Sequence, residues 1–269
     1  MMRSDAFRRS ESGATMEDNG FRLFRADLHM HTCLSPCGDW DMTPRAVVEK
    51  SVEKNLDIIA VTDHNTAENA GAAMEKGRAL GLTVLPGMEI CSEEEAHVIA
   101  LFESLESALA MQNFVYDHLK GENNPDIFGY QVVANADDEV IDQNPHLLIG
   151  AVSVDLNTLV DKIHELGGLA VAAHIDKSAF SIPSQLGFIP PDLPLDAVEV
   201  SFRSRPEDSG QKLLMGLKIP CITSSDAHYP GEIGRVSTKF YMKSPCIREI
   251  RLALQGKEGR KIVYSTRAG

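Results

Sequence analysis

The sequence predicts a single α/β domain built on a closed or nearly closed barrel of parallel strands. From about residue 21 onward, apolar segments typical of strands alternate with amphipathic segments typical of helices, and about seven strand-like segments occur. One of them, DIIAVTD at residues 57–63, has the continuous apolar run of a strand covered on both faces. The chain has 269 residues, 43% of them hydrophobic, which is enough for one large core. An open doubly wound sheet is the alternative architecture.

Helices are expected where apolar residues recur at helical spacing between a capping residue and a glycine. The helix over residues 43–56 is expected to have Thr43 as its N-cap and Pro44 in its first position. Over residues 156–168, leucines and an isoleucine recur at helical spacing before a glycine pair that ends the helix. Further helices are expected over residues 66–81, 104–120 and 245–256. Strands are expected over residues 24–30, 57–63, 82–90, 96–102, 169–175, 195–201 and 218–228.

Two segments stand apart from this alternation. In residues 121–150, YQVV and EVID flank the polar stretch ANADD, which predicts a hairpin-like surface insertion. Residues 1–20 are polar and have no apolar stretch after their basic residues, so we expect a disordered tail and not a signal peptide. The barrel domain is therefore assigned to residues 21–265, and either Met1 or Met16 can be the natural start. No apolar run approaches the ~18 residues of a membrane span.

The composition narrows the class of partner. The formal net charge of −13 disfavours a protein that grips long nucleic acid through a basic surface. It is compatible with a small phosphorylated substrate, because bound cations reverse the local charge. The five cysteines suggest no disulfide framework, so reduced thiols and a cytoplasmic location are expected. The sequence predicts no oligomeric state.

Six of the nine histidines follow the ends of expected strands or lie close to them. They are His29, His31, His64, His97, His174 and His228. His97 is the exception in position, because it opens its strand. In parallel α/β folds the carboxyl ends of strands carry ligands and catalytic groups. The other three histidines, His118, His146 and His164, lie in helices or in the insertion and have a structural interpretation.

Acidic residues accompany these histidines. Asp63 precedes His64, Glu89 ends a strand, and Asp226 lies two residues before His228. In a strand, residues i and i+2 share a face, so each H-x-H or D-x-H pair is aimed at one place. Imidazole with carboxylate is the ligand set of zinc, manganese and iron. The sequence predicts two bound ions and has nearly enough ligands for a third.

The order of the motifs DLHMHT, VTDHNT, GMEI, HVIALF, AHID and SSDAHYPGEIG resembles the PHP (polymerase and histidinol phosphatase) family of metal-dependent phosphoesterases. The resemblance covers about residues 21 to 265. It implies a distorted (β/α)7 barrel, which agrees with the alternation, and a site of two or three divalent ions (Zn, Mn or Fe).

The resemblance also implies a ligand set for each ion. The first ion would take His29, His31, Glu89 and Asp226. The second would share Glu89 and take His97 and His174. The third would take His64, His228 and one ligand from the loop that follows the first motif.

That loop departs from the family pattern. Many relatives carry SDG or a further histidine there, whereas this chain has CLSPCGDWDMTP, which is three residues longer. Cys37, Asp39 or Asp41 can supply the missing ligand. The SPCG form resembles a subgroup with no firmly assigned substrate, so the resemblance implies a reaction type and not a metabolite.

The expected function is hydrolysis of phosphate esters, with phosphate released from a small phosphomonoester or nucleotide. Metal ions lower the pKa of a shared water, so hydroxide becomes available to attack phosphorus near neutral pH. His228 or Asp63 can assist proton transfer. Lys177 and Arg203 follow strand ends and can contact the substrate phosphate. Glu199 can orient a ligand histidine.

Three other functions stay open. A phosphodiesterase or exonuclease on oligonucleotide ends needs a basic, aromatic groove, for which Trp40 and Arg45 are the only hints. A carbon–nitrogen hydrolase usually has a bridging lysine, a position that Glu89 fits here. The third alternative is a non-catalytic, metal-bound domain. The roles of residues 121–150 and of the Pro-rich segment 177–194 are not predicted; the second segment can wall the site or cap the barrel.

Overall fold

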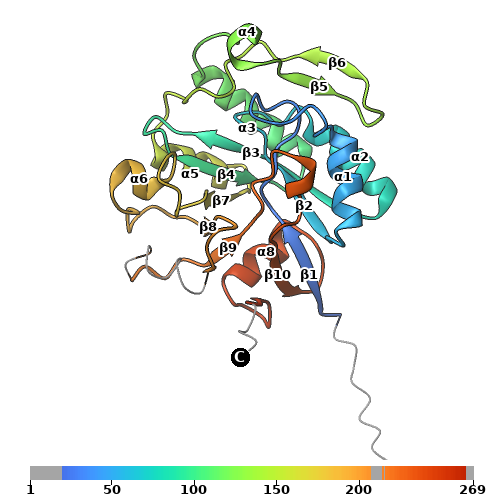
Figure 1. Ribbon diagram of the computed structural model, residues 1–269. Helices are drawn as coiled ribbons and strands as arrows, with labels where there is room; N and C mark the ends of the chain where they lie inside the picture. The colour runs from blue at the N-terminus through green and yellow to red at the C-terminus, as the bar shows by residue number, and fades with distance from the viewer. Residues whose placement is uncertain (1–19, 207–213, 215, 265–269) are drawn as a thin grey trace, which may run out of the picture.

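The structure, a computed structural model, describes residues 20–206, 214 and 216–264 and is centred on a curled nine-stranded sheet (Figure 1). The disordered tail expected for residues 1–20 lies outside the described residues except for Gly20. The strands follow one another across the sheet in the order β11-β10-β1-β2-β3-β4-β7-β8-β9. They are β1 (Arg22–Asp27), β2 (Ile58–Val61), β3 (Thr83–Cys91), β4 (His97–Leu101), β7 (Leu169–Ala172), β8 (Ala197–Val200), β9 (Cys221–Thr223), β10 (Thr238–Met242) and β11 (Lys261–Ile262).

The first and last barrel strands meet just beyond their carboxyl ends. Met30, after β1, forms a parallel bridge with Ala227, after β9. The His31 amide donates to the Ala227 carbonyl at 2.9 Å, and the Asp226 amide donates to the His29 carbonyl at 2.9 Å. Seven strands, β1 to β4 and β7 to β9, are thereby curled into a barrel that is joined at one rim. This is the distorted barrel that the sequence predicts.

The directions of three strands differ from the wholly parallel sheet that the alternation predicts. β4 runs antiparallel to both β3 and β7. A five-residue turn, 92–96, is too short for a crossover helix, so the chain reverses there. β10 and β11 were not predicted; they add antiparallel strands at the edge of β1. β10 buries Thr238, Phe240 and Met242 and so alternates as a half-covered strand does.

The helices surround the sheet (Figure 1). They are α1 (Pro44–Glu53), α2 (Ala70–Leu80), α3 (Leu105–His118), α4 (Pro125–Phe128), α5 (Leu156–Glu165), α6 (Ile182–Leu186), α8 (Ile247–Leu254) and the 3-10 turn η2 (Pro230–Glu232). The predicted start of α1 is confirmed, because the Thr43 hydroxyl accepts from the Ala46 amide at 3.1 Å and Pro44 follows. No helix among the described residues is long and apolar enough to span a membrane.

The predicted hairpin in residues 121–150 is confirmed. β5 (Val132–Ala134) pairs antiparallel with β6 (Val140–Gln143), and α4 precedes them. Two asparagines that follow His64 attach this segment to the barrel. Asn65 donates to the carbonyls of Leu148 and Gly150, and Asn69 donates to that of Val132. The segment is thus held at the same rim as the histidines.

Candidate metal centre

The predicted ligand residues converge at one rim of the barrel. His29 and His31 follow β1, His64 follows β2, and Glu89 lies near the end of β3. The remaining ones are His174 after β7, and Asp226 and His228 after β9. His97 opens β4, and because β4 is antiparallel its first residue lies at this same rim. Met30, between the first two histidines, is fully buried in the core.

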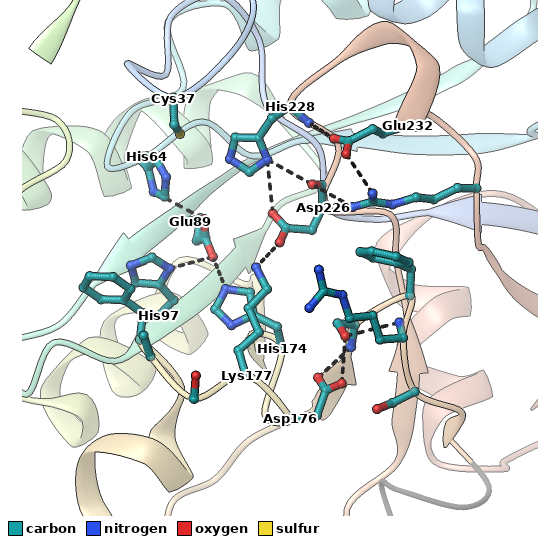
Figure 2. A pocket seen from close by; sticks show the side chains of 18 of the residues that line it. Cys37, His64, Glu89, His97, His174, Asp176, Lys177, Asp226, His228 and Glu232 are labelled. Carbon is teal, nitrogen blue, oxygen red and sulfur yellow. Dashed lines mark hydrogen bonds and ion pairs between the residues drawn. The ribbon is translucent and has the colours of Figure 1, made fainter.

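The Glu89 carboxylate lies at the centre and touches five imidazoles. Its Oε1 lies 2.8 Å from His97 Nδ1 and 3.0 Å from His174 Nε2. Its Oε2 lies 3.2 Å from His31 Nε2, 3.3 Å from His64 Nδ1 and 3.4 Å from His29 Nε2. The two oxygens therefore face different sets of histidines, as Figure 2 shows in part.

Asp226 is the second central carboxylate. Its Oδ1 lies 3.4 Å from His29 Nε2 and 3.6 Å from His31 Nε2. Its Oδ2 pairs with the Lys177 ammonium, which comes from the opposite side of the pocket (Figure 2). Asp226 and His174 both have a positive φ, +51° and +27°. Such backbone conformations cost energy in residues other than glycine, and they cluster at functional sites.

Neighbouring groups fix the ring orientation of the first two histidines. His29 Nδ1 lies 3.0 Å from Glu199 Oε1, and His31 Nδ1 lies 2.9 Å from Ser35 Oγ. Burial opposes a charge on these two rings, but neighbouring carboxylates, Glu199 and Glu89 for His29 and Asp226 and Glu89 for His31, outweigh it and raise the pKa of each. A bound ion would replace the Nε2 proton that each ring turns toward Glu89 and Asp226. Glu199 thus lies where a residue that orients a ligand histidine belongs.

The electrostatics of the cluster keep two histidines neutral. Burial holds the pKa of His64 well below its ordinary value. Burial, together with the His31 ring, lowers the pKa of His228 to about 4. Burial opposes ionisation of Glu89, but the imidazoles of His97 and His29 outweigh it and hold the pKa of this carboxyl well below its ordinary value. Neutral imidazole and ionised carboxylate are the forms that bind a metal ion.

The loop after the first motif brings one of its three candidate ligands to the histidines. Donor atoms of Cys37, His31, His64 and His228 lie within 4.8 Å of one another. The other two candidates lie elsewhere: Asp39 Oδ1 accepts from the Asp41 amide at 2.9 Å. Asp41 lines a separate depression with Thr43 and Glu49.

Asp63 lies behind the site and not in it. Its carboxylate accepts from the Thr32 amide, the Thr32 hydroxyl and the Ser35 hydroxyl, each at 2.7 Å. It is fully buried, and it is not among the described residues that line the pocket. These bonds give Asp63 a positioning role and do not suit the proton transfer that the sequence suggests.

A cavity of about 860 Å³ opens over the cluster. Lys177 and Arg203, which the sequence predicts as contacts of the substrate phosphate, line this cavity. Phe180 also lines it, so segment 177–194 forms part of the wall of the site. Phe202, Tyr229 and Arg235 also line it and were not predicted. The Arg235 guanidinium lies 3.6 Å from the centroid of the Phe202 ring. Arg235 lies beyond η2 and not at a strand end, and Phe202 is a single aromatic residue outside any motif, so the sequence gives neither a signal that separates it from surface residues.

The donor set fits divalent transition ions. Groups such as His29, His31, Glu89 and Asp226, whose donor atoms lie within 4.8 Å of one another, combine imidazole nitrogens with carboxylate oxygens. His174 Nδ1 and Glu199 Oε2 are buried and have no hydrogen-bond partner among the described residues. Such orphaned atoms are rare in proteins and call for a cation or water nearby.

The three remaining histidines have structural contacts. His118 Nδ1 lies 2.8 Å from the Phe114 carbonyl, and His164 Nε2 lies 2.8 Å from Asp196 Oδ2. The His146 ring packs on Tyr116 with ring centroids 4.1 Å apart. None of the three lines the described pocket.

Comparison with known proteins identifies the family. The PHP domain profile matches residues 27–177, and the PHP-associated profile matches residues 208–257. The chain is 26% identical to the uncharacterised protein YqxK of Bacillus subtilis, with 88% of this chain and 63% of that protein covered. It is 36% identical to the 5′-3′ exoribonuclease Rnm of Salmonella typhimurium over 32% of this chain and 29% of that protein.

The fold has solved counterparts. The lesion-specific endonuclease PfuEndoQ from Pyrococcus furiosus superimposes with a TM-score of 0.67 at 19% identity, with 90% of this chain and 58% of that chain covered. The chain thus spans less than two thirds of the length of these relatives. The family profile matches more than half of this chain. The chain therefore belongs to the PHP domain family of metal-dependent phosphoesterases.

Proposed function

We propose that the chain hydrolyses phosphate esters with bound divalent ions and releases phosphate from a small phosphomonoester or nucleotide. The observation that supports this best is the Glu89 carboxylate, whose Oε1 faces His97 and His174 while its Oε2 faces His29, His31 and His64. A carboxylate with a separate histidine set on each oxygen suits a group shared between two ions, the arrangement that two-metal phosphatases use.

In this proposal one ion is held by His29, His31, Glu89 and Asp226, and a second by Glu89, His97 and His174. A third site would include His64 and His228. When bound, such ions stabilise charge on phosphoryl oxygens and supply an activated water.

The chain's own residues bind the substrate and move the proton. The Lys177 ammonium and the Arg203 guanidinium line the cavity and can donate to phosphate oxygens. His228 donates from Nδ1 to the Asp226 carbonyl at 3.0 Å, so a neutral Nε2 is left to bind an ion or to accept a proton. Glu232 holds this residue in place, because its Oε2 accepts from the His228 amide at 2.9 Å.

The test is phosphate release from a broad panel of phosphomonoesters and nucleotides by chain loaded with manganese, zinc or iron. His31→Ala is expected to lower kcat/KM by more than about 100-fold, because even residues that only orient a ligand are worth 10–100-fold. His164→Ala, a histidine outside the pocket, is the matched control and should keep full activity. The proposal fails if metal-replete chain hydrolyses no member of the panel. Bound metal without turnover would instead favour a non-catalytic domain.

A phosphodiesterase acting on oligonucleotide ends is the second candidate, and one observation favours it. Phe180, Phe202 and Tyr229 line the cavity with partly exposed rings beside Lys177 and Arg235. Aromatic rings beside basic groups bind successive bases and phosphates. The sequence predicts no such groove. The net charge of −13 disfavours a basic surface along a long duplex, so this candidate concerns strand ends. That expectation is not general for the fold, because endonuclease Q, which has a similar fold, was solved with a 27-mer duplex.

The two candidates give different products. A phosphatase releases inorganic phosphate from an end-labelled oligonucleotide and leaves its length unchanged. A nuclease shortens the oligonucleotide and releases nucleotides. Electrophoresis of the labelled strand beside a phosphate assay separates them, and Phe202→Ala should weaken binding of the nucleic acid end more than that of a phosphate without a base.

A further inference from the structure

We propose that Cys37 is a thiolate ligand of the third metal site, so that this site combines one sulfur with two imidazoles. The inference rests on the proposed metal-dependent function and extends it by naming the donor and therefore the class of ion. Donor atoms of Cys37, His64 and His228 lie within 4.8 Å of one another. Figure 2 shows the Cys37 side chain between the two rings, at the edge of the cavity.

The loop that carries Cys37 is fixed on both sides of the site. The Ser35 hydroxyl donates to Asp63, and the His64 amide donates to Ser35 Oγ at 3.1 Å. On the other side, the Asp39 amide donates to the His228 carbonyl at 2.8 Å. Cys37 lies between these two attachments, so its position relative to both histidines is built into the backbone.

The glycine of the SPCG sequence closes this loop. A Cβ on Gly38 would lie 2.2 Å from the Thr32 carbonyl oxygen, a distance at which the backbone would have to move. The Gly38 amide also donates to the Ser35 carbonyl at 2.8 Å. Ser35 and Gly38 of the SPCG sequence thus each have contacts that fix the position of Cys37.

The other candidate ligands near the third site have different partners, so the thiol of Cys37 is the donor left for it. Asp39 accepts from the Asp41 amide, and Asp41 faces a different depression. His31 uses Nδ1 for Ser35 and turns Nε2 to Glu89 and Asp226, so it belongs to the first ion. The third site then has three protein ligands, Cys37, His64 and His228.

Three protein ligands with one open position is the composition of catalytic zinc sites, some of which mix cysteine with histidine. A thiolate is a soft ligand and selects zinc over manganese and magnesium, which prefer oxygen. The third site should therefore prefer zinc to manganese.

The test uses the full chain loaded with cobalt(II), which reports thiolate ligation by a sulfur-to-cobalt charge-transfer absorption in the near ultraviolet. Wild type is expected to show this absorption. Cys37→Ser should lose it and should bind the third ion at least about 10-fold more weakly. Cys246→Ser is the matched control, because Cys246 is partly exposed and does not line the described pocket. The inference is overturned if wild type shows no such absorption, or if Cys37→Ser retains it.

A second measurement covers the case in which Cys37→Ser does not fold. In wild-type chain, zinc should slow alkylation of the exposed Cys37 thiol at least about 10-fold and leave Cys246 unchanged, as mass spectrometry of the peptides would report. Equal alkylation of Cys37 with and without zinc would contradict the proposal. Both readouts are independent of turnover. A chain with the absorption but no phosphoesterase activity would refute the proposed function alone, and the reverse result would refute this inference alone.

Discussion

At the scale of single residues, the candidate ligands depend on partners that do not face the cavity. Glu199 and Ser35 each accept a hydrogen bond from the Nδ1 of one histidine and turn its Nε2 toward Glu89 and Asp226. The sequence predicts the histidines and the orienting role of Glu199, because residue type and position after a strand carry that information. It does not predict that Glu199 contacts His29, since the two residues are joined only by the fold.

Glu199→Gln is expected to weaken metal binding by about 10- to 100-fold, because the amide keeps a hydrogen bond to His29 but loses the charge that makes the ring basic. Competition with a chromogenic chelator measures the affinity. Asp196→Asn is the control, since Asp196 pairs with His164 in the same way at 2.8 Å but outside the described pocket. Unchanged metal affinity in Glu199→Gln would show that the charge of Glu199 does not support metal binding by His29.

At the scale of elements, the direction of β4 explains what the sequence could and could not predict. His97 is the exception in a parallel sheet, and it joins the site because β4 is reversed. The apolar run of residues 96–102 has the same pattern in either direction, so it does not predict whether this strand is parallel or antiparallel to its neighbours. β10 was missed because its five residues, TKFYM, include Thr238 and Lys239, and its pairing with β1 and β11 is visible only in the fold.

The loop of residues 35–38 gives the first prediction at this scale. Gly38→Ala should lower the free energy of unfolding by about 1–3 kcal/mol, because its Cβ would overlap the Thr32 carbonyl and force the loop outward. Urea unfolding measures the change. Gly231→Ala is the control, since a Cβ there would meet no atom of the described residues within 4 Å. Equal stability of the two variants would show that the loop adapts without strain.

The start of α5 gives a prediction with a pH dependence. Asp155 Oδ1 accepts from the Thr158 amide at 3.0 Å, and this bond, followed by the one to the Thr158 hydroxyl, lowers the pKa of Asp155. A lowered folded-state pKa contributes stability that is present above the unfolded value of about 3.9 and is lost as pH falls through the folded value. Asp155→Ala should cost about 1 kcal/mol near pH 7.

The difference between wild type and Asp155→Ala should therefore shrink as the pH falls below about 4. Asp155→Asn, which keeps the cap without the charge, should show no such change. Unfolding by denaturant across the pH range checks both. A difference that stays constant from pH 7 to pH 3 would contradict the assigned role of the carboxylate.

At the scale of the whole molecule, the candidate ligands join the ends of five strands, β1, β2, β3, β7 and β9, with the start of β4. An ion bound there stabilises only the folded chain, by about 2.7 kcal/mol when its concentration is 100 times its dissociation constant. Removal of the ions by a chelator should therefore lower Tm by roughly 5–10 °C. Calorimetry with and without chelator measures this.

The control for that experiment is a chain without the carboxylate that the first two ions share. In Glu89→Ala the chelator should lower Tm by less than in wild type, because only the third site keeps all its ligands. A wild-type Tm that does not respond to the chelator, in protein whose metal content does fall, would show that the ions do not stabilise the barrel.

The bridge between Met30 and Ala227 also sets the order of events when the chain is made. Its two sides are separated by about 200 residues, which take about 10–40 s to synthesise at 5–20 residues per second. During that interval His29 and His31 are already part of the chain, while Asp226 and His228 do not yet exist. The metal centre is therefore among the last parts of the protein to form, and its complete loading with ions must follow the synthesis of β9.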